Sequence, residues 1–213
     1  DLLDYYTLWV HQIKTPIAAS RLLVAEVSDR EVKQQLEQEI FKIDSYTNLV
    51  LQYLRLESFH YDLVFEKVQV EDLVKEVVRK YALFFIQKGL TVNLHDLDKI
   101  IVTDKKWLLV VIEQILSNSL KYTREGGLEI YMEGQELCIK DTGIGIKNSD
   151  VLRVFERGFS GYNGRLTQQS SGLGLYLSKK ISEELGHQIR IESEIGTGTT
   201  VRIKFSNMNL MIE

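Results

Sequence analysis

The sequence has little cysteine and no long apolar run. Its single cysteine, Cys138, cannot form an internal disulfide and has no partner at metal-ligand spacing, so we expect a buried thiol on a strand in a reducing compartment. No apolar run reaches the roughly 18 residues that a membrane-spanning helix needs, and no signal peptide is visible. We therefore expect these 213 residues to fold as a soluble protein.

The chain also lacks an excess of positive charge. Its formal net charge is −4, and its lysines and arginines are scattered, whereas a nucleic-acid-binding protein usually carries a basic stripe. We therefore exclude DNA and RNA as partners. A hydrophobic content of 44% and a charged content of 26% are ordinary for a globular protein, and the length favours two domains.

The first 62 residues predict a helical hairpin. Residues 2–27 are amphipathic and contain Pro16, the only proline, which should kink or loosen the helix locally. Ser28 and Asp29 are turn and N-cap types, and a second helix is expected over residues 30–59. Its apolar positions recur with gaps of four and three, as in a coiled coil or bundle: Leu36, Ile40, Ile43, Thr47, Val50 and Leu54.

One hairpin would leave this seam half covered. Two copies would bury it in a symmetric dimer with a four-helix core, so the sequence predicts a homodimer. The pattern changes near Asp62, which we take as the boundary between domains 1–62 and 63–213. We also expect the chain to be part of a longer protein, because it opens without methionine and already within a helical pattern.

The rest of the chain alternates strand and helix signals, which predicts an α+β sandwich with helices covering one sheet. Strands are expected at residues 65–70, 90–94, 100–102, 128–133, 136–141, 188–193 and 199–205, and helices at 71–88, 105–122 and 173–185.

Three polar clusters follow these elements. Gln114, Asn118 and Lys121 share a face of the helix at 105–122, where an amide oxygen suits Mg²⁺ and an ammonium suits phosphate. The alternative is a solvated helix face. Asp141-Thr142-Gly143-Ile144-Gly145 follows a strand, where the carboxylate could accept from an exocyclic amine such as that of adenine, or the segment could be only a tight turn.

The third cluster, Ser171-Gly172-Leu173-Gly174-Leu175, lies at the start of a helix, where free N–H groups favour phosphate. The polar stretch 159–171 before it is long enough to form a lid. Gly196-Thr197-Gly198-Thr199 precedes the last strand as a hairpin turn or a further wall of the pocket.

The order of these motifs resembles a known family. The series is Asn118…Lys121-Tyr122, Asp141-x-Gly143-x-Gly145, Phe155-Glu156-Arg157, Gly172-Leu173-Gly174-Leu175 and Gly196-Thr197-Gly198-Thr199. It is similar to the N, G1, F, G2 and G3 boxes of the sensor histidine kinases, whose ATP-binding domain is of the histidine kinase, Hsp90 and gyrase type. The stretch from His11 to Pro16 resembles the phosphoacceptor box of the same family, and residues 9–16 and 155–161 are most similar to its BceS-like, intramembrane-sensing members.

The resemblance implies an enzyme that phosphorylates its own His11 with ATP and Mg²⁺ and passes the phosphoryl group to an aspartate of a response regulator. Thr15 would help to position the water that removes phosphate from that partner. Most members carry Glu or Asp directly after the histidine, but this chain has Gln12, which can orient an imidazole and cannot take its proton. The ordinary alternatives are a surface histidine and a threonine that packs before Pro16.

The nucleotide contacts that the resemblance implies are Asn118, which would also bind the metal, and Lys121, Tyr122, Asp141, Gly143, Gly145, Arg157, Gly172, Leu173, Gly174 and Thr199. Arg157 or Arg165 could steady the γ-phosphate or be a solvated lid residue. Gln114 stands where the kinases usually have Asn and the Hsp90, gyrase and MutL ATPases have the glutamate that activates water.

Two other functions compete with this interpretation. An ATP-driven machine of the Hsp90 type is disfavoured by the missing carboxylate at Gln114, and a degenerate, nucleotide-gated binding module is favoured only by Gln12. The resemblance further implies a location on the cytoplasmic side of the cell membrane, with an anchor in a missing part of the protein. An ABC transporter is then a possible input partner through that part.

Overall fold

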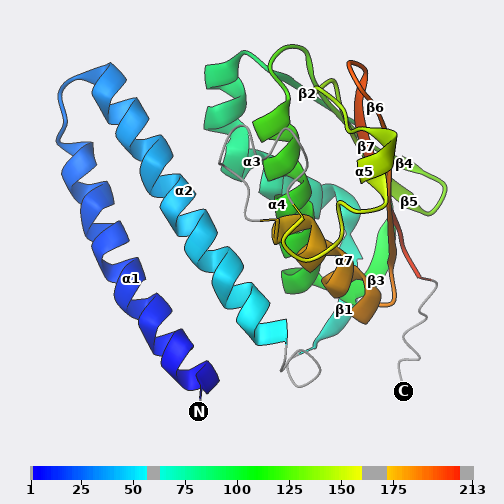
Figure 1. Ribbon diagram of the computed structural model, residues 1–213, viewed down its shortest axis with the longest axis horizontal. Helices are drawn as coiled ribbons and strands as arrows, with labels where there is room; N and C mark the ends of the chain where they lie inside the picture. The colour runs from blue at the N-terminus through cyan, green and yellow to red at the C-terminus, as the bar shows by residue number, and fades with distance from the viewer. Residues whose placement is uncertain (1, 57–62, 160–171, 207–213) are drawn as a thin grey trace. The chain divides into compact units, whose positions relative to one another are not determined.

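The computed structural model of the protein describes residues 2–56, 63–159 and 172–206 (Figure 1). The chain divides into two compact units, Asp1–Asp62 and Leu63–Glu213. The predicted last turn of the second helix, residues 57–59, lies outside the described residues.

The first unit is an antiparallel pair of helices, α1 (Leu2–Ala25) and α2 (Arg30–Arg55). The loop between them ends at Asp29, whose carboxylate accepts from two backbone N–H groups of the first turn of α2, at 2.9 and 3.0 Å. This is the N-cap that the sequence predicts. Helix α1 continues through Pro16, so any loosening there does not divide it in two.

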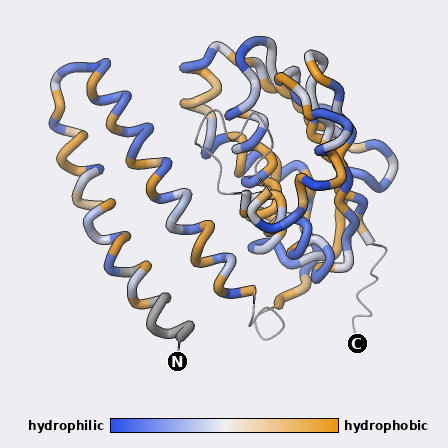
Figure 2. Tube along the Cα trace, viewed as in Figure 1, coloured by the Kyte–Doolittle hydropathy of each residue, from blue (hydrophilic) through white to orange (hydrophobic). Residues whose placement is uncertain are grey.

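Apolar side chains of the hairpin are only partly covered. In α1, Val10, Ile17 and Val24 recur every seven residues and are buried. In α2, three members of the predicted seam stay exposed, with 39% of Leu36, 51% of Ile43 and 37% of Val50 accessible. Leu22 and Leu23 near the end of α1 are also exposed. Figure 2 shows hydrophobic segments recurring along both helices, and a single hairpin leaves part of them in water.

The second unit contains seven strands and four helices among the described residues. The strands are β1 (Phe65–Gln69), β2 (Thr91–His95), β3 (Ile100–Asp104), β4 (Gly127–Glu133), β5 (Glu136–Asp141), β6 (Gln188–Glu194) and β7 (Gly198–Lys204). The helices are α3 (Val70–Lys88), α4 (Lys105–Tyr122), α5 (Asn148–Val151) and α7 (Gly174–Glu184). The short α5 forms where the sequence predicts neither a helix nor a strand.

The strands form two sheets rather than the single predicted one. Five strands lie in the order β2-β4-β5-β7-β6, with only β2 and β4 parallel, while β1 and β3 form a separate antiparallel pair. Asp104 fixes the end of that pair, because its carboxylate accepts from Val64 N at 2.8 Å and from Trp107 N at 3.0 Å, at the N-cap of α4. Sequence periodicity predicts strands but not their partners.

Helices α3, α4 and α7 cover one face of the five-stranded sheet (Figure 1). The strand residues that point toward them alternate along each strand and are buried: Leu128, Ile130, Leu137, Ile139, Ile191, Val201 and Ile203. Asp141 has the same parity on β5 as Leu137 and Ile139, so its carboxylate also points toward the helices. This alternation places one charged group at the edge of an apolar core.

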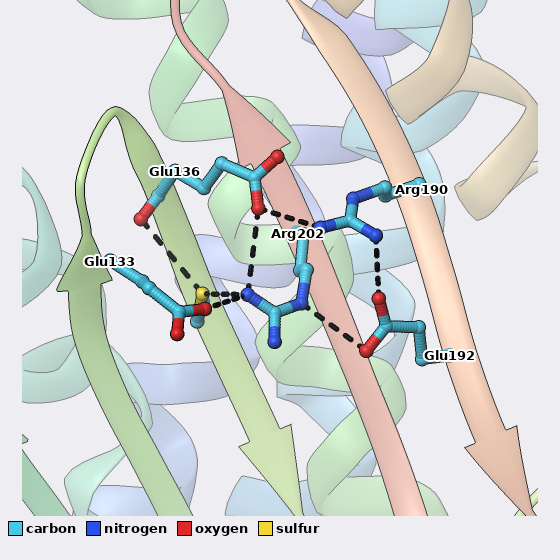
Figure 3. Close-up of polar contacts among 6 residues, drawn as sticks. Glu133, Glu136, Arg190, Glu192 and Arg202 are labelled. Atoms are coloured by element: carbon cyan, nitrogen blue, oxygen red, sulfur yellow. Dashed lines mark hydrogen bonds and ion pairs between the residues drawn. The ribbon is translucent and has the colours of Figure 1, made fainter.

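The other face of the sheet carries a network of charged side chains (Figure 3). Arg202 lies at its centre, with Nε 3.3 Å from Glu192 and Nη1 in contact with Glu133 and, at 3.4 Å, with Glu136. The same Nη1 lies 3.1 Å from Sγ of Cys138, which is fully buried on β5, as the sequence predicts. The network links four strands and covers the thiol.

The loop after β5 packs against the turn between β6 and β7. The Gly196 N–H donates to Ile144 O at 3.0 Å, and the Ile146 N–H donates to Ser193 Oγ at 2.9 Å. Gly145 lies between them with φ +71°, and a Cβ there would be 2.0 Å from Glu194 O. The contact therefore requires a residue without a side chain.

We expect Gly145→Ala to be much more destabilising than Gly134→Ala. Both glycines have positive φ, but nothing lies within 4 Å of a Cβ at Gly134, so the alanine there meets only backbone strain. The steric clash at Gly145 should cost about 2 kcal/mol more in the free energy of unfolding. Urea unfolding of the two variants measures the difference, and equal losses would contradict this packing.

A buried histidine, His187, joins α7, β3 and the end of β7. Its Nε2 lies 3.0 Å from Thr103 Oγ1, and its Nδ1 accepts from Ser206 N at 3.3 Å, so a neutral ring with the proton on Nε2 satisfies both contacts. The ring meets Phe205 edge-on at 5.2 Å. Burial lowers the pKa of His187 to about 4.

This histidine should make the protein acid-sensitive. The unfolded chain takes up a proton near pH 6.5 and the folded chain only near pH 4, so stability is lost as the pH falls through that window. The loss from this group should be about 3 kcal/mol. His187→Gln should flatten the dependence in urea unfolding between pH 7 and 4.

His95→Gln is the matched control. The Asp96 hydrogen bond raises the pKa of the exposed His95, so this side chain stabilises the fold at low pH and its loss should not flatten the curve. An unchanged pH dependence in His187→Gln would contradict the assignment.

Candidate functional site

The carboxylate of Asp141 is buried and accepts hydrogen bonds on both of its oxygens. Only 6% of the residue is exposed. Its Oδ1 accepts from Gly143 N at 2.9 Å and from Thr199 N at 3.2 Å, and its Oδ2 accepts from Ser119 Oγ at 3.0 Å. Since a carboxylate has about four acceptor positions, one on Oδ2 is left for a further donor.

Burial and hydrogen bonding oppose each other at this group. Burial raises the pKa of Asp141, and the hydrogen bonds from Gly143, Ser119 and Thr199 lower it, so the net shift is upward. In its ionised form the carboxylate can only accept, so it is suited to binding an N–H group of a ligand.

The chain beside Asp141 is tightly packed. The Ile144 N–H donates to Tyr122 O at 3.2 Å, and a Cβ at Gly143 would lie 2.9 Å from the same oxygen. A Cβ at Gly198 would lie 1.9 Å from Asp141 O. The family resemblance implies nucleotide contacts at Gly143 and Gly145, but contacts within the chain already favour glycine at both positions.

Thr123 adds an unsatisfied polar atom to this region. It is fully buried at the end of α4, and its Oγ1 has no hydrogen-bond partner among the described residues. A Cβ at Gly143 would lie 3.2 Å from that oxygen. A buried hydroxyl without a partner is costly, which favours a ligand or water at this point.

The predicted cluster on α4 meets the start of α7 at one point. A Cβ at Gly174 would lie 2.8 Å from Gln114 Oε1, the end of a flexible side chain, so the amide approaches the helix start closely but could shift to make room. The first backbone N–H groups of α7 have no side-chain cap from Leu173, the N-cap residue. Their dipoles favour a negative group nearby.

Asn118 and Lys121 lie one turn apart on α4 and are both partly exposed. The ammonium of Lys121 lies 5.0 Å from the ring centroid of Tyr122. Burial lowers the pKa of Lys121 to about 8, so the side chain is still mostly charged at neutral pH and less strongly hydrated than a surface lysine.

Gly172, just before α7, contacts the stretch from Phe155 to Phe159. The Gly158 N–H donates to Gly172 O at 3.1 Å, and a Cβ at Gly172 would lie 2.5 Å from Gly158 C. Arg157 is exposed. The predicted lid, residues 159–171, lies almost wholly outside the described residues, and Arg165 with it.

The structure therefore joins several of the predicted residues and leaves others apart. Asp141, Gly143 and Thr199 are hydrogen-bonded together, Tyr122 adjoins Gly143, and Gln114 adjoins Gly174. Gln12 and Thr15 lie in the first unit, exposed on α1, and the side chain of His11 is outside what the structure describes. Within the described residues, no group of three or more His, Cys, Asp or Glu side chains could hold a metal ion.

Sequence reasoning missed Ser119 and Thr123. Ser119 directly follows Asn118 and is 3% exposed, and Thr123 directly follows Tyr122. Ser119 and Thr123 are small polar residues at positions where the apolar pattern of the helix predicts a buried side chain. Small polar residues are common in helices for other reasons, so this signal does not single them out.

Comparisons with known proteins agree with this geometry. Residues 103–208 match the family described as histidine kinase-, DNA gyrase B-, and HSP90-like ATPase. The matched stretch includes α4, the Asp141 region and α7. None of the helices in the described parts of the chain is long and apolar enough to cross a membrane.

The curated relatives extend the similarity over both units. The sensor histidine kinase YxdK of Bacillus subtilis is 37% identical over 209 residues, which are 94% of this chain and 64% of that protein. The sensor protein kinase GraS of Staphylococcus aureus is 37% identical over 212 residues, or 97% of this chain and 61% of that protein. The chain thus spans about three fifths of the length of these relatives.

Solved structures share the fold. Full-length ShkA in complex with AMPPNP has a TM-score of 0.68 at 21% identity, covering 95% of this chain and 45% of that one. The histidine kinase AdeS of Acinetobacter baumannii has a TM-score of 0.64 at 22% identity, covering 93% of this chain and 98% of that one. These structures show the shared fold, and the curated relatives show that the chain belongs to the sensor histidine kinase family.

Proposed function

We propose that the chain binds ATP with Mg²⁺ in the second unit, phosphorylates its own His11 and transfers the phosphoryl group to an aspartate of a response regulator. The observation that carries the proposal is the buried carboxylate of Asp141, which is held by three donors and keeps one acceptor position on Oδ2. Such a position can accept a hydrogen bond from an exocyclic amine.

The residues around Asp141 fit a purine nucleotide. Thr123 has a buried hydroxyl without a hydrogen-bond partner among the described residues, and the first turn of α7, like the start of any long helix, favours phosphate. Lys121, with its partly buried ammonium, supplies positive charge on the same helix as Asn118. The remaining proposed contacts are Tyr122, Gly143, Gly145, Arg157, Gly172, Leu173, Gly174 and Thr199.

Asn118 is the proposed metal ligand. Mg²⁺ usually keeps several waters and takes only one or two protein ligands when it binds with a nucleotide, so a single amide oxygen is sufficient. The metal would neutralise charge on the phosphates and orient them. A dedicated carboxylate cage is not needed for this role.

In the first unit, His11 is the proposed nucleophile. A neutral imidazole can attack phosphorus as a nucleophile. Gln12, the next residue, can hold the ring by a hydrogen bond but cannot accept its proton. Thr15 lies one turn further along α1 on the same side as His11, where it could position the water that hydrolyses the aspartyl phosphate of the response regulator.

The exposed seam of α2 supports a homodimer with a four-helix core. Leu36, Ile43 and Val50 lie at seven-residue intervals and are 37–51% exposed in one chain. A second hairpin is the simplest partner for such a stripe, because the same residues can pack against their own copies. Dimerisation is therefore assigned to the first unit and ATP binding to the second.

The names of the relatives support a place in signal transduction, since YxdK and GraS are called sensor kinases. A receiver domain with an acceptor aspartate is the partner that this proposal requires. A BceS-like subfamily, an ABC transporter as input partner and a location on the cytoplasmic side of a membrane remain predictions from the resemblance.

Two alternatives fit less well. An ATP-driven machine would need a carboxylate to activate water, and the corresponding position holds Gln114, whose amide oxygen instead lies close to Gly174. A degenerate binding module is favoured only by Gln12, and a decayed site would have no reason to keep every proposed nucleotide contact, among them Asn118 and Asp141.

The dimer can be tested with one charge in the seam. Ile43→Lys should raise the dimer dissociation constant about a hundredfold or more, because two copies each lose the burial of an isoleucine worth about 1.5–3 kcal/mol. Sedimentation equilibrium gives the constant. Ile86→Lys, at a position 74% exposed on α3, is the control and should leave it unchanged. Equal behaviour of the two variants would argue against the seam.

The kinase activity can be tested with γ-labelled ATP and Mg²⁺. We expect a label that is lost in acid and survives alkali, as phosphohistidine does, and that disappears in His11→Gln. His95→Gln, which removes a histidine of the second unit, should leave the label intact. Binding of ATP without any label on His11 would reject the autokinase and favour the nucleotide-gated binding module.

A further inference from the structure

Ser119 makes an unusual contact for a serine within a helix. Helical serines commonly donate back to the carbonyl one turn earlier, as Ser178 does to Gly174 O at 2.9 Å. The Ser119 hydroxyl instead donates to Asp141 Oδ2, 22 residues away, at 3.0 Å. Both residues are buried, with 3% and 6% of their surfaces exposed. The contact crosses from α4 to the sheet.

The two oxygens of Asp141 are held in different ways. Oδ1 accepts only from backbone N–H groups, of Gly143 and Thr199, which any sequence with this fold would supply. Oδ2 accepts from a side chain, and it is the oxygen with a position left for a ligand. The residue at position 119 therefore controls the oxygen that would meet the base.

We propose that Ser119 is a positioning residue for base recognition, which holds Asp141 Oδ2 as an acceptor directed at the exocyclic amine of adenine. The inference rests on the proposed ATP site and deepens it. Without the serine hydroxyl, Oδ2 loses the only donor that the described residues give it, and the carboxylate can rotate or take up a proton. A protonated Oδ2 would present a donor to the amine instead of an acceptor.

The electrostatic surroundings make this contact sensitive. Burial raises the pKa of Asp141, and the bonds that oppose this come from Gly143, Ser119 and Thr199, with no charged side chain of the described ranges among the causes. Lys140, next along β5, is exposed on the other face, with its ammonium 3.6 Å from Glu129. Removing the Ser119 donor should therefore raise the pKa of Asp141 further.

The test compares ATP with purine riboside 5′-triphosphate, which lacks the 6-amino group, on the 213-residue chain. In the wild type, ATP should bind more tightly than the analogue. Ser119→Ala should raise the dissociation constant for ATP about tenfold or more, the usual effect of losing a hydrogen bond to a charged group. The dissociation constant for the analogue should rise much less. The pH below which ATP binding is lost should also move upward.

Two further variants distinguish the loss of the hydrogen-bond donor from a change in the size of the side chain. Ser119→Cys keeps the size and loses a strong donor, so it should behave as Ser119→Ala. Ser182→Ala removes another buried serine, whose Oγ has no hydrogen-bond partner among the described residues, and it should bind both nucleotides as the wild type does. Titration of the Asp141 carboxyl carbon by NMR, without nucleotide, reads its pKa directly.

The outcomes are distinct. Equal losses for ATP and the analogue, wild-type binding by Ser119→Ala or Ser119→Cys, or an unmoved Asp141 titration would overturn the role of Ser119 while the ATP site stands. Failure of the wild-type chain to bind ATP at any pH would overturn the proposed function and this inference together.

Discussion

The carboxylate of Asp141 lies between the helix layer and the five-stranded sheet, and hydrogen bonds from several elements of the second unit hold it there. Its three donors come from α4, from the loop after β5 and from the start of β7. Each must be within about 3 Å, so the helix, the loop and the hairpin must converge on one point. An unpaired buried charge would cost far more than these bonds return, which makes the convergence obligatory.

The glycines around this point follow from the same constraint. Gly145 and Gly198 lie where a methyl group would overlap carbonyl oxygens of Glu194 and Asp141. They allow the loop after β5 and the turn before β7 to pack backbone against backbone. This explains glycine at both positions before any ligand is considered. In the proposed function, a nucleotide would bind to backbone and side-chain positions that the fold already fixes without it.

Local patterns in the sequence predict much of this architecture. Alternation of apolar residues predicts β4, β5, β6 and β7, the helical period predicts α3, α4 and α7, and Asp29 predicts the start of α2. The family resemblance selects Asp141, and the curated relatives confirm the family. These features are readable because each depends on neighbours in sequence.

Features that depend on distant partners were missed. Ser119 and Asp141 are 22 positions apart, and His187 and Thr103 are 84 positions apart, so no local pattern predicts these contacts. The pairing of β1 with β3 was missed because the strands have similar local patterns, which do not identify their partners. Nothing in a helical serine distinguishes one that donates across to a sheet from one that bonds its own helix. The sequence likewise predicts no helix where α5 forms, because a helix of four residues is too short to show a helical period.

The measurement that tests the central claim most directly is a crystal structure of this chain with a non-hydrolysable ATP analogue and Mg²⁺. The account predicts the exocyclic amine of adenine within hydrogen-bond distance of Asp141 Oδ2, with Ser119 still donating to the same oxygen and the metal on Asn118. A nucleotide whose base lies away from Asp141, or an Asp141 that turns from Ser119 to make the contact, would contradict it.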